Sequence, residues 1–300
     1  MNDAFEIVPL RRGGVGIRST RYREICHPGV GPREEAERVY IQGLDLRRRW
    51  AAERGEFVVW DVGLGGAANA TAVIHAAAGS GCSLRIVSFD WGVEPLDFAL
   101  RHADALGYFG GLERWCRELV EHGSVTFDPG GVRVRWDLIP GDFTEHMRAG
   151  RGPGGRDLPS PQAILYDPHS PAANPEMWTL PLFRDLFAWI DPRRSWCGLA
   201  TYSRSTSVRV ALLLAGWRVG AGSGTETKEE TTVAATGAGR LGSVLDARWL
   251  QRARRSGCAE PWVGPPYGGR PLSDRTWEEL RSLPQFAANG ALPTPGRDAL

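Results

Sequence analysis

The chain has 300 residues, 42% of them hydrophobic and 24% charged, which are the fractions of a folded globular protein rather than of a disordered one. The length fits one large domain, or one domain with smaller appendages. The formal net charge is +1, so there is no overall basic field of the kind that indicates nucleic-acid binding.

The N-terminal part of the chain predicts an extension in front of a catalytic domain. Residues 1–32 contain several glycines and alternating arginines and predict an irregular or β-rich segment, in which His27 is most simply a loop histidine with local hydrogen bonds. Residues 34–50 carry apolar side chains at roughly helical spacing and predict a helix. We therefore expect residues 1–50 to pack against the domain that follows.

A short apolar run at residues 57–60 predicts a buried strand, and a glycine-rich turn follows it directly. The turn has the order D-x-G-x-G-G, with its acid at Asp61 and its glycines at Gly63, Gly65 and Gly66. A strand, a glycine turn and small helix-opening residues are typical of the first crossover of a nucleotide-binding α/β fold, where the amide-rich helix end faces the ligand.

The acid before the glycines decides which ligand the turn favours. A dinucleotide fingerprint has a third glycine at the place where this chain has Asn69. The carboxylate of Asp61 would repel a pyrophosphate but could hold a cationic amino-acid group or a water molecule. The turn thus favours S-adenosylmethionine over NAD, although an ordinary βα turn without a ligand would also explain it.

Three further acids follow predicted strands. Asp90 closes the strand 84–89, ~20 residues beyond the turn, where a pair of ribose hydroxyls is usually bound. Asp142 follows a strand that begins at Leu138, where it could bond the adenine amino group or cap the next helix. Asp167 closes the strand 163–166 at the sheet edge where open α/β folds bind ligands. It is the best catalytic candidate, and a structural cap on its proline-rich loop is the alternative.

The remaining segments predict alternating helices and strands. Predicted helices span 71–78, 95–106, 112–121, 143–148, 182–190, 207–215 and 240–254. Further predicted strands span 125–127, 132–136, 196–202, 217–219 and 230–235. The final helix, strand, turn and strand are how a methyltransferase sheet ends, with an antiparallel last strand that a dehydrogenase would not need. We therefore expect an α/β fold with a catalytic domain over residues 51–236.

The chain changes in character over residues 237–300, which are rich in proline and glycine and contain no second glycine fingerprint. We expect residues 259–300 to form an extended segment that wraps the domain and is partly disordered at its end.

The cysteines and the apolar runs indicate the compartment. Five scattered cysteines form no C-x-x-C pair, which favours a reducing environment and argues against a disulfide framework or a zinc site. The N-terminus has no apolar signal core, and no apolar run reaches the ~18 residues of a membrane span. We expect a cytoplasmic protein without a metal.

Four stretches of the chain together resemble one known family. They are H-x(3)-G-x-x-E-E from His27 to Glu35, D-x-G-x-G-G-x-x-N from Asp61 to Asn69, D-P-H-S-P-A-A-N-P-E-M-W from Asp167 to Trp178, and K-x-E from Lys228 to Glu230. The third stretch is the most specific. This combination resembles the MnmC-type methyltransferase family, which acts on 5-aminomethyl-(2-thio)uridine at the wobble position of tRNA.

The resemblance implies a class I, Rossmann-like fold that binds S-adenosylmethionine and needs no metal. It implies a cofactor site made of Asp61, Gly63, Gly65, Gly66, Asn69, Asp90, Asp142 and Asp167. It places the catalytic acid at Asp167 and the substrate contacts at His27, Glu35, His169, Asn174, Trp178 and Lys228. A primary amine attacks a sulfonium methyl only as the free base, and a carboxylate beside it can orient it and help to take its proton.

The chain also departs from the family pattern. Pro168 and His169 stand where the family has Gly-Phe, which changes the wall beside the methyl acceptor, and Asp61 replaces a glutamate. The FAD-dependent oxidase domain of the bifunctional members is not expected here. The sequence therefore leaves three alternatives to a tRNA methyltransferase: a methyltransferase of a small-molecule amine, a cofactor-binding or RNA-binding module without catalysis, and a nicotinamide dehydrogenase.

Overall fold

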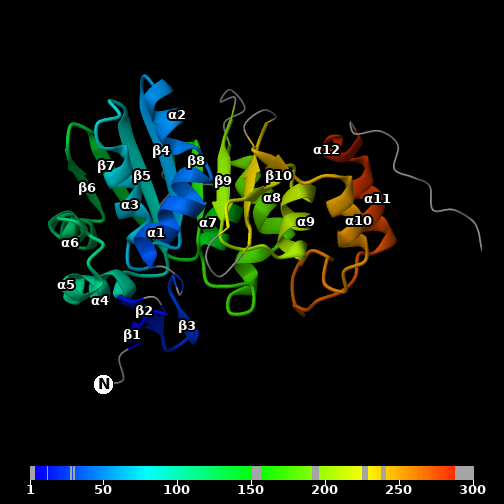
Figure 1. Ribbon diagram of the computed structural model, residues 1–300, viewed down its shortest axis with the longest axis horizontal. Helices are drawn as coiled ribbons and strands as arrows, with labels where there is room; N and C mark the ends of the chain where they lie inside the picture. Colours follow the sequence, from blue (N-terminus) through cyan, green and yellow to red (C-terminus); the bar gives the residue numbers. More distant parts are fainter. Residues whose placement is uncertain are drawn as a thin grey trace, which may run out of the picture.

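The computed structural model describes residues 4–11, 13–27, 29, 31–150, 157–190, 196–224, 229–237 and 241–287. Figure 1 shows a large sheet with helices packed against it, a small N-terminal sheet at one edge, and a helical C-terminal segment beyond β10. Within the described residues, the large sheet has nine strands in the order β12-β10-β11-β9-β8-β4-β5-β7-β6. They are β4 (Glu56–Val62), β5 (Ser83–Asp90), β6 (Ser124–Phe127), β7 (Val134–Pro140), β8 (Ala163–Tyr166), β9 (Gly198–Thr201), β10 (Arg218–Gly222), β11 (Thr231–Ala235) and β12 (Ser243–Val244).

The direction of the strands brings the predicted acids to one edge. Strands β9, β8, β4, β5 and β7 run parallel, while β11 runs antiparallel between β9 and β10. The predicted α/β fold with a mostly parallel sheet and an antiparallel last strand is thereby confirmed. The register aligns Val62 with both Phe89 and Tyr166, so the residues that follow β4, β5 and β8 leave the sheet at the same level.

Helices cover both faces of the large sheet because its central strands are apolar on both sides. Phe57 and Val59 of β4 belong to one core cluster, and Val58, Trp60 and Val62 belong to the other. The first cluster is covered by α1 (Pro32–Ala36), a π-helical turn η1 (Glu37–Gln42), α2 (Leu46–Ala52), α3 (Ala68–Ala77), α4 (Glu94–Arg101), α5 (Ala103–Leu106) and α6 (Glu113–His122). The second is covered by α7 (Phe143–Ala149), the 3-10 turn η3 (Pro175–Trp178), α8 (Leu180–Ala188) and α9 (Thr206–Leu214).

The N-terminal extension forms a small antiparallel sheet, which confirms the β-rich prediction. Its strands are β1 (Phe5–Pro9), β2 (Val15–Ser19) and β3 (Glu24–Ile25). The single helix predicted over 34–50 is instead broken into α1, η1 and α2. The break comes at Asp45, which has the left-handed φ of 51° that aspartate tolerates better than most residues.

Strand β7 corrects a second prediction, since the sequence placed two separate strands here. The two predicted strands, 132–136 and one beginning at Leu138, left Asp137 between them. In the structure Asp137 is only 5% exposed, and it accepts hydrogen bonds from Ser124 at 2.8 Å and from Arg85 at 3.2 Å. A buried acid with such partners can be part of a continuous strand.

The C-terminal segment is more regular than predicted. Residues 274–287, expected to be extended, contain α11 (Asp274–Ser282) and α12 (Pro284–Ala287), which follow α10 (Ala247–Arg254). Gln285 of α12 is buried and bonds both the backbone N–H and the carbonyl of Val219, so this segment covers the outer part of β10. The predicted disorder of the chain end falls on residues 288–300, outside the described residues.

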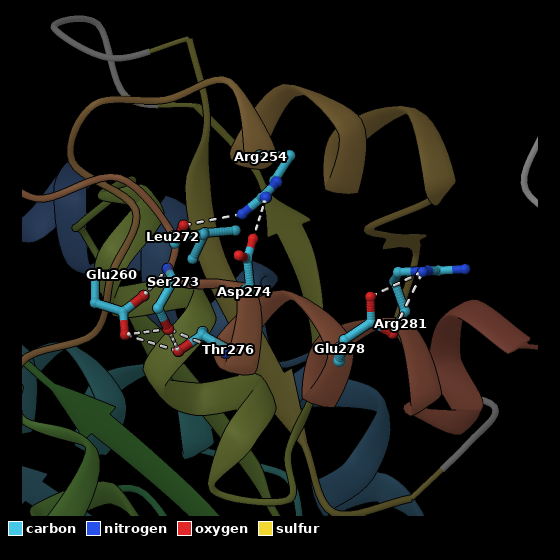
Figure 2. Close-up of polar contacts among 8 residues, drawn as sticks. All are labelled: Arg254, Glu260, Leu272, Ser273, Asp274, Thr276, Glu278 and Arg281. Atoms are coloured by element: carbon cyan, nitrogen blue, oxygen red, sulfur yellow. Dashed lines mark hydrogen bonds and ion pairs between the residues drawn. The ribbon is translucent and has the colours of Figure 1, made fainter. Parts of the chain in front are cut away.

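Figure 2 shows how the start of α11 is held. Ser273 is its N-cap, and the Glu260 carboxylate accepts hydrogen bonds from the Ser273 backbone at 2.8 Å and from the Thr276 hydroxyl at 2.7 Å. On the other side, Arg254 donates to the carbonyl of Leu272 at 2.9 Å. Glu260 thus attaches the loop before α11 to the first turn of the helix.

We expect Glu260→Ala to lower the free energy of unfolding by about 1–2 kcal/mol, because it removes bonds from a helix N-terminus. Glu278→Ala is the matched control, since Glu278 makes only an exposed ion pair with Arg281 among the interactions described here. Urea denaturation and amide exchange of α11 would measure the effect. Equal losses in the two variants would contradict the role given to Glu260.

Candidate active site

A cavity of about 780 Å³ opens at the carboxyl ends of β4, β5 and β8, and the N-terminal sheet contributes to its walls. It brings together ten of the residues predicted for the site: His27, Glu35, Gly63, Gly65, Gly66, Asn69, Asp90, Asp167, His169 and Asn174. Three others do not line it, namely Asp61, Asp142 and Trp178. Lys228 lies outside the described residues.

The glycine turn brings two segments of backbone close together at the cavity floor. Gly63 has a φ of 93°, and a Cβ added there would lie 2.6 Å from the carbonyl oxygen of Asp167. At Gly66 a Cβ would lie 2.5 Å from the hydroxyl of Tyr108, which donates a hydrogen bond to the Gly66 carbonyl. Gly65, with a φ of 51°, has no atom within 4 Å of an added Cβ. The turn therefore needs glycine for close packing at two positions and for its backbone conformation at Gly63 and Gly65.

Asp90 is bonded to this turn from the next strand. Its Oδ2 accepts a hydrogen bond from the Gly65 backbone at 2.8 Å, and its Oδ1 accepts one from the Trp91 backbone at 2.8 Å. Burial raises the pKa of Asp90, and these two N–H groups offset part of that rise. Asp90 thus has an acceptor group at the cavity wall in the position where the sequence predicts ribose binding.

Asp61 lies beneath the cavity rather than in its wall. It is fully buried, and its Oδ2 accepts a hydrogen bond from Ser88 at 2.8 Å. The Ser88 oxygen in turn accepts one from the indole of Trp136 at 2.9 Å. Burial, together with the charges of Asp167 and Asp90, raises the pKa of Asp61 to about 8. Without a ligand this carboxyl is therefore mainly protonated at neutral pH.

Two other predicted residues have structural contacts. Asp142 is the N-cap of α7 and accepts a hydrogen bond from the Thr144 backbone at 2.8 Å, while its neighbours Gly141 and Phe143 line the cavity. Trp178 is buried, and its indole donates to the carbonyl of His169 at 2.9 Å. In these contacts, Asp142 fixes the start of a helix and Trp178 fixes the loop that follows β8.

Asp167 is the centre of the polar cluster at the other end of the cavity. Its Oδ2 accepts a 2.6 Å hydrogen bond from the Asn69 amide and lies 4.0 Å from Nε2 of His27. Burial raises the pKa of Asp167 to about 6, and Glu35 adds to the rise, while His27 and the hydrogen bond from Asn69 oppose it. A carboxylate with this pKa can accept a proton near neutral pH.

The loop after Asp167 is attached to the N-terminal sheet, a contact that the sequence analysis missed. Glu24 of β3 accepts hydrogen bonds from the backbone of Ser170 at 3.0 Å and from its hydroxyl. Nδ1 of His169 lies 3.4 Å from the Glu24 carboxylate, and its ring contacts Tyr22 with centroids 4.0 Å apart. The hydroxyl of Tyr202 donates to the carbonyl of Pro168 at 2.9 Å. No local sequence signal marks these contacts, because Glu24 and Ser170 lie 146 positions apart.

The cavity fits S-adenosylmethionine in size and in chemistry. Its volume lies in the range of small-molecule sites. Among the described residues that line the cavity, Asn69 has its side-chain oxygen Oδ1 buried without a hydrogen-bond partner. Unpaired buried acceptors suit a ligand that carries donors or positive charge. The Asp90 carboxylate suits the hydroxyls of a ribose.

Two features are absent from the part of the chain that the structure describes. No group of three His, Cys, Asp or Glu side chains in it is placed to hold a metal ion. None of its helices is long and apolar enough to cross a membrane.

Residues 111–237 match a family model described as S-adenosyl-L-methionine-dependent methyltransferase. The matched segment contains β8, the Asp167 loop and the antiparallel end of the sheet. The chain is an S-adenosylmethionine-dependent methyltransferase. The nicotinamide dehydrogenase alternative is therefore wrong.

Similar curated proteins are named tRNA 5-methylaminomethyl-2-thiouridine biosynthesis bifunctional protein MnmC. The protein of Cupriavidus necator is 29% identical over 270 residues, or 80% of this chain, and that of Aeromonas hydrophila is 29% identical over 254 residues, or 76%. This methyltransferase spans about 37% of the length of each. The crystal structure of MNMC2 from Aquifex aeolicus covers 93% of this chain and 85% of its own, with a TM-score of 0.67 and 20% identity. The resemblance predicted from the motifs is confirmed by the curated relatives, and the solved structure shows the shared fold.

The close approach at Gly63 yields a prediction. We expect Gly63→Ala to lower the free energy of unfolding by about 2–3 kcal/mol and to weaken S-adenosylmethionine binding about tenfold, because Cβ would displace the backbone of Asp167. Gly107→Ala is the control, since Gly107 has a φ of 66° but no atom within 4 Å of an added Cβ. We expect Gly107→Ala to lower the free energy of unfolding by about 1 kcal/mol. Urea denaturation would measure the stability of the two variants, and calorimetric titration would measure their S-adenosylmethionine binding. Equal effects in Gly63→Ala and Gly107→Ala would count against the role of the contact between Gly63 and Asp167.

The raised pKa of Asp167 predicts a pH-dependent cost in stability. The folded protein holds this proton more tightly than the unfolded chain, whose ordinary value is 3.8. The tighter binding of this proton therefore adds to the free energy of unfolding below pH 3.8, and this contribution is lost as the pH rises through about 6. We expect Asp167→Asn to be more stable than the native protein by about 2 kcal/mol at pH of about 8, with the difference shrinking as the pH falls below 6.

Asp142→Asn controls for the loss of a carboxylate at the same edge of the sheet. Asparagine caps helices as well as aspartate does, so this variant should differ from the native protein by no more than about 0.5 kcal/mol. Thermal denaturation across the pH range would follow both variants. A loss of stability in Asp167→Asn at alkaline pH would contradict the expected sign.

Proposed function

We propose that this methyltransferase transfers the methyl group of S-adenosylmethionine to the primary amine of a 5-aminomethyluridine at the wobble position of tRNA. The observation that carries the proposal is the place of Asp167, a carboxylate with little exposure in the same cavity as the glycine turn and Asp90. The names of the MnmC relatives support the choice of a tRNA uridine as acceptor. We also propose that residues 51–236 form the catalytic domain, between an N-terminal extension over 1–50 and a C-terminal segment over 237–300.

The cofactor would extend from the Asp90 wall, across the glycine turn, to the Asp167 cluster. Asp90 would accept hydrogen bonds from the ribose hydroxyls, and Gly63, Gly65 and Gly66 would form the floor. Asn69 and Asp167 would face the cationic amino-acid part. Asp61 would act from beneath the floor, and Asp142 would reach the adenine amino group only with its free carboxylate oxygen while it caps α7. Bound S-adenosylmethionine supplies a methyl group made electrophilic by a positively charged sulfur.

The acceptor amine would bind at the Asp167 end, where negative charge predominates. His27 faces Glu35 and Asp167, and His169 faces Glu24, so three carboxylates stand against two histidines at this end of the cavity. This arrangement favours an ammonium group. Asp167 would take a proton from the ammonium group so that the nitrogen lone pair becomes available, and Asn69 would keep the carboxylate in one orientation.

The remaining acceptor contacts would come from the loop after β8. His169 and Asn174 line the cavity, and Trp178 supports His169 through its carbonyl. A substrate contact of Lys228 also remains a proposal. Glu230, two positions further along the chain, accepts a 2.7 Å hydrogen bond from the buried Arg209, which fixes the start of β11.

The test is methyl transfer from labelled S-adenosylmethionine to tRNA that carries 5-aminomethyl-2-thiouridine. We expect incorporation with this tRNA and none with the same tRNA lacking the aminomethyl group. Asp167→Asn should lower turnover by about 100-fold or more, because it removes the group that takes the proton. Binding of the tRNA should weaken steeply with added salt, as phosphate contacts require.

Three outcomes would count against parts of the proposal. Protein that binds S-adenosylmethionine in a titration but leaves the tRNA unmodified would overturn the acceptor. Transfer to small-molecule amines instead, without salt sensitivity, would favour the alternative acceptor class. Unchanged turnover in Asp167→Asn would show that the carboxylate does not take part.

A further inference from the structure

His27 lies between two carboxylates that come from distant parts of the chain. Its Nε2 is 4.0 Å from Oδ2 of Asp167, and its Nδ1 is 3.8 Å from Oε1 of Glu35. The three side chains are only 12–14% exposed. The imidazole thus stands behind Asp167 in a chain of three ionisable groups, with Glu35 at its far end.

The backbone holds His27 in an unusual conformation. Its φ is 54°, in the left-handed region that costs a residue with a Cβ roughly 1 kcal/mol or more. The preceding residue is fixed, because the backbone of Cys26 donates to the carbonyl of Ile17 in β2 at 2.8 Å. Glu35 is held by its own backbone bond to Gly31 at 3.1 Å. Strained residues that the surrounding structure holds in place are concentrated at functional sites.

The groups around His27 favour its charged form. Glu35 from α1, Asp167 from the loop after β8 and Asp61 from β4 face it with carboxyl groups, and the buried hydroxyls of Tyr40 and Tyr202 complete the cluster. Burial alone lowers the pKa of His27, but the nearby carboxylates of Glu35 and Asp167 outweigh it, so the pKa is raised.

We propose that His27 is a positioning residue of the methyl transfer: a cation held by Glu35 that keeps the Asp167 carboxylate charged and oriented toward the acceptor amine. This inference rests on the proposed function of the site. In this inference His27 and Glu35 support Asp167, and neither of them contacts the acceptor. The family resemblance, by contrast, implies that both are substrate contacts.

The arrangement solves a chemical problem of this cavity. Burial and Glu35 both favour a protonated Asp167, which could not take a proton from an ammonium group. A fixed positive charge 4.0 Å from Oδ2 favours the carboxylate. In the reaction the N–C bond forms, the C–S bond breaks to leave a thioether, and the proton released by the amine passes to Asp167. His27 changes no bond in this sequence and acts only through Asp167.

The first test is the pH dependence of turnover with the tRNA substrate. We expect His27→Asn to lower kcat about tenfold at neutral pH and to move the acidic limb of the profile about one pH unit higher, with KM for S-adenosylmethionine within about twofold. Asparagine is chosen because it tolerates the left-handed backbone. His169→Gln is the matched control: it removes another cavity histidine, paired with Glu24 rather than Asp167, and should leave the position of the limb unchanged.

The second test measures His27 itself, in the full chain and without turnover. Histidine-labelled protein would be titrated by NMR, and the signal missing in His27→Asn identifies the residue among the six histidines. We expect its midpoint to lie above the ordinary 6.5 and to fall in Asp167→Asn and in Glu35→Gln. If His27→Asn fails to fold, the signal is assigned instead as the one whose midpoint falls in both Asp167→Asn and Glu35→Gln, and its midpoint in native protein still decides the case.

The outcomes separate this inference from the proposed function. An imidazole that titrates below the ordinary value, or a loss of kcat in His27→Asn with an unmoved acidic limb, would overturn the role of His27. A native enzyme that leaves the tRNA unmodified would refute the proposed acceptor, and the NMR titration would then still decide whether His27 is the cation behind Asp167.

Discussion

The site depends on the close approach of two backbones, at Gly63 and Asp167. The two strands that precede them are neighbours in the sheet, and the Asp167 N–H continues their ladder with a 2.9 Å bond to the carbonyl of Val62. An added Cβ at Gly63 would lie 2.6 Å from the Asp167 carbonyl, so only glycine lets the chains leave the sheet together. This contact places the Asp167 side chain within reach of Asn69 on α3 and of the glycine turn. The glycine turn thus would form the floor under the cofactor, and it also sets the position of the carboxylate that would take the proton.

The second constraint is the concentration of buried acids at this edge of the sheet. Asp61, Asp90 and Asp167 all have a raised pKa because burial disfavours their charged forms. Such groups lower the stability of the empty protein at neutral pH and are relieved by a cation. S-adenosylmethionine carries an ammonium and a sulfonium charge, so its binding would reduce the electrostatic cost of the site. The preference for a cationic ligand and the loss of stability thus have the same physical origin.

The parts of the site that the sequence predicted are those determined by local pattern. An apolar run followed by an acid marks β4, β5 and β8, and the parallel direction of these strands then brings Asp90 and Asp167 to one edge. The sequence could not decide between the two roles of Asp142, because a helix cap and an adenine contact need the same residue type at the same place. It missed α11, whose surroundings are rich in proline and glycine and whose start depends on Glu260, fourteen positions before the helix. It also missed Glu24, because no periodicity links a residue of the N-terminal sheet to Ser170.

Glu24 explains how the chain accommodates its main departure from the family pattern. Where the family resemblance places phenylalanine, His169 keeps a flat ring, and that ring lies against Tyr22 with centroids 4.0 Å apart. An imidazole in a partly buried wall needs a polar partner, and the Glu24 carboxylate 3.4 Å from its Nδ1 supplies one. Burial lowers the pKa of His169 while Glu24 opposes that effect, so the pair adds no large fixed positive charge to the acceptor wall. The substitution therefore preserves the aromatic character of the wall, and the N-terminal sheet would become part of the proposed acceptor site through a contact that phenylalanine could not make.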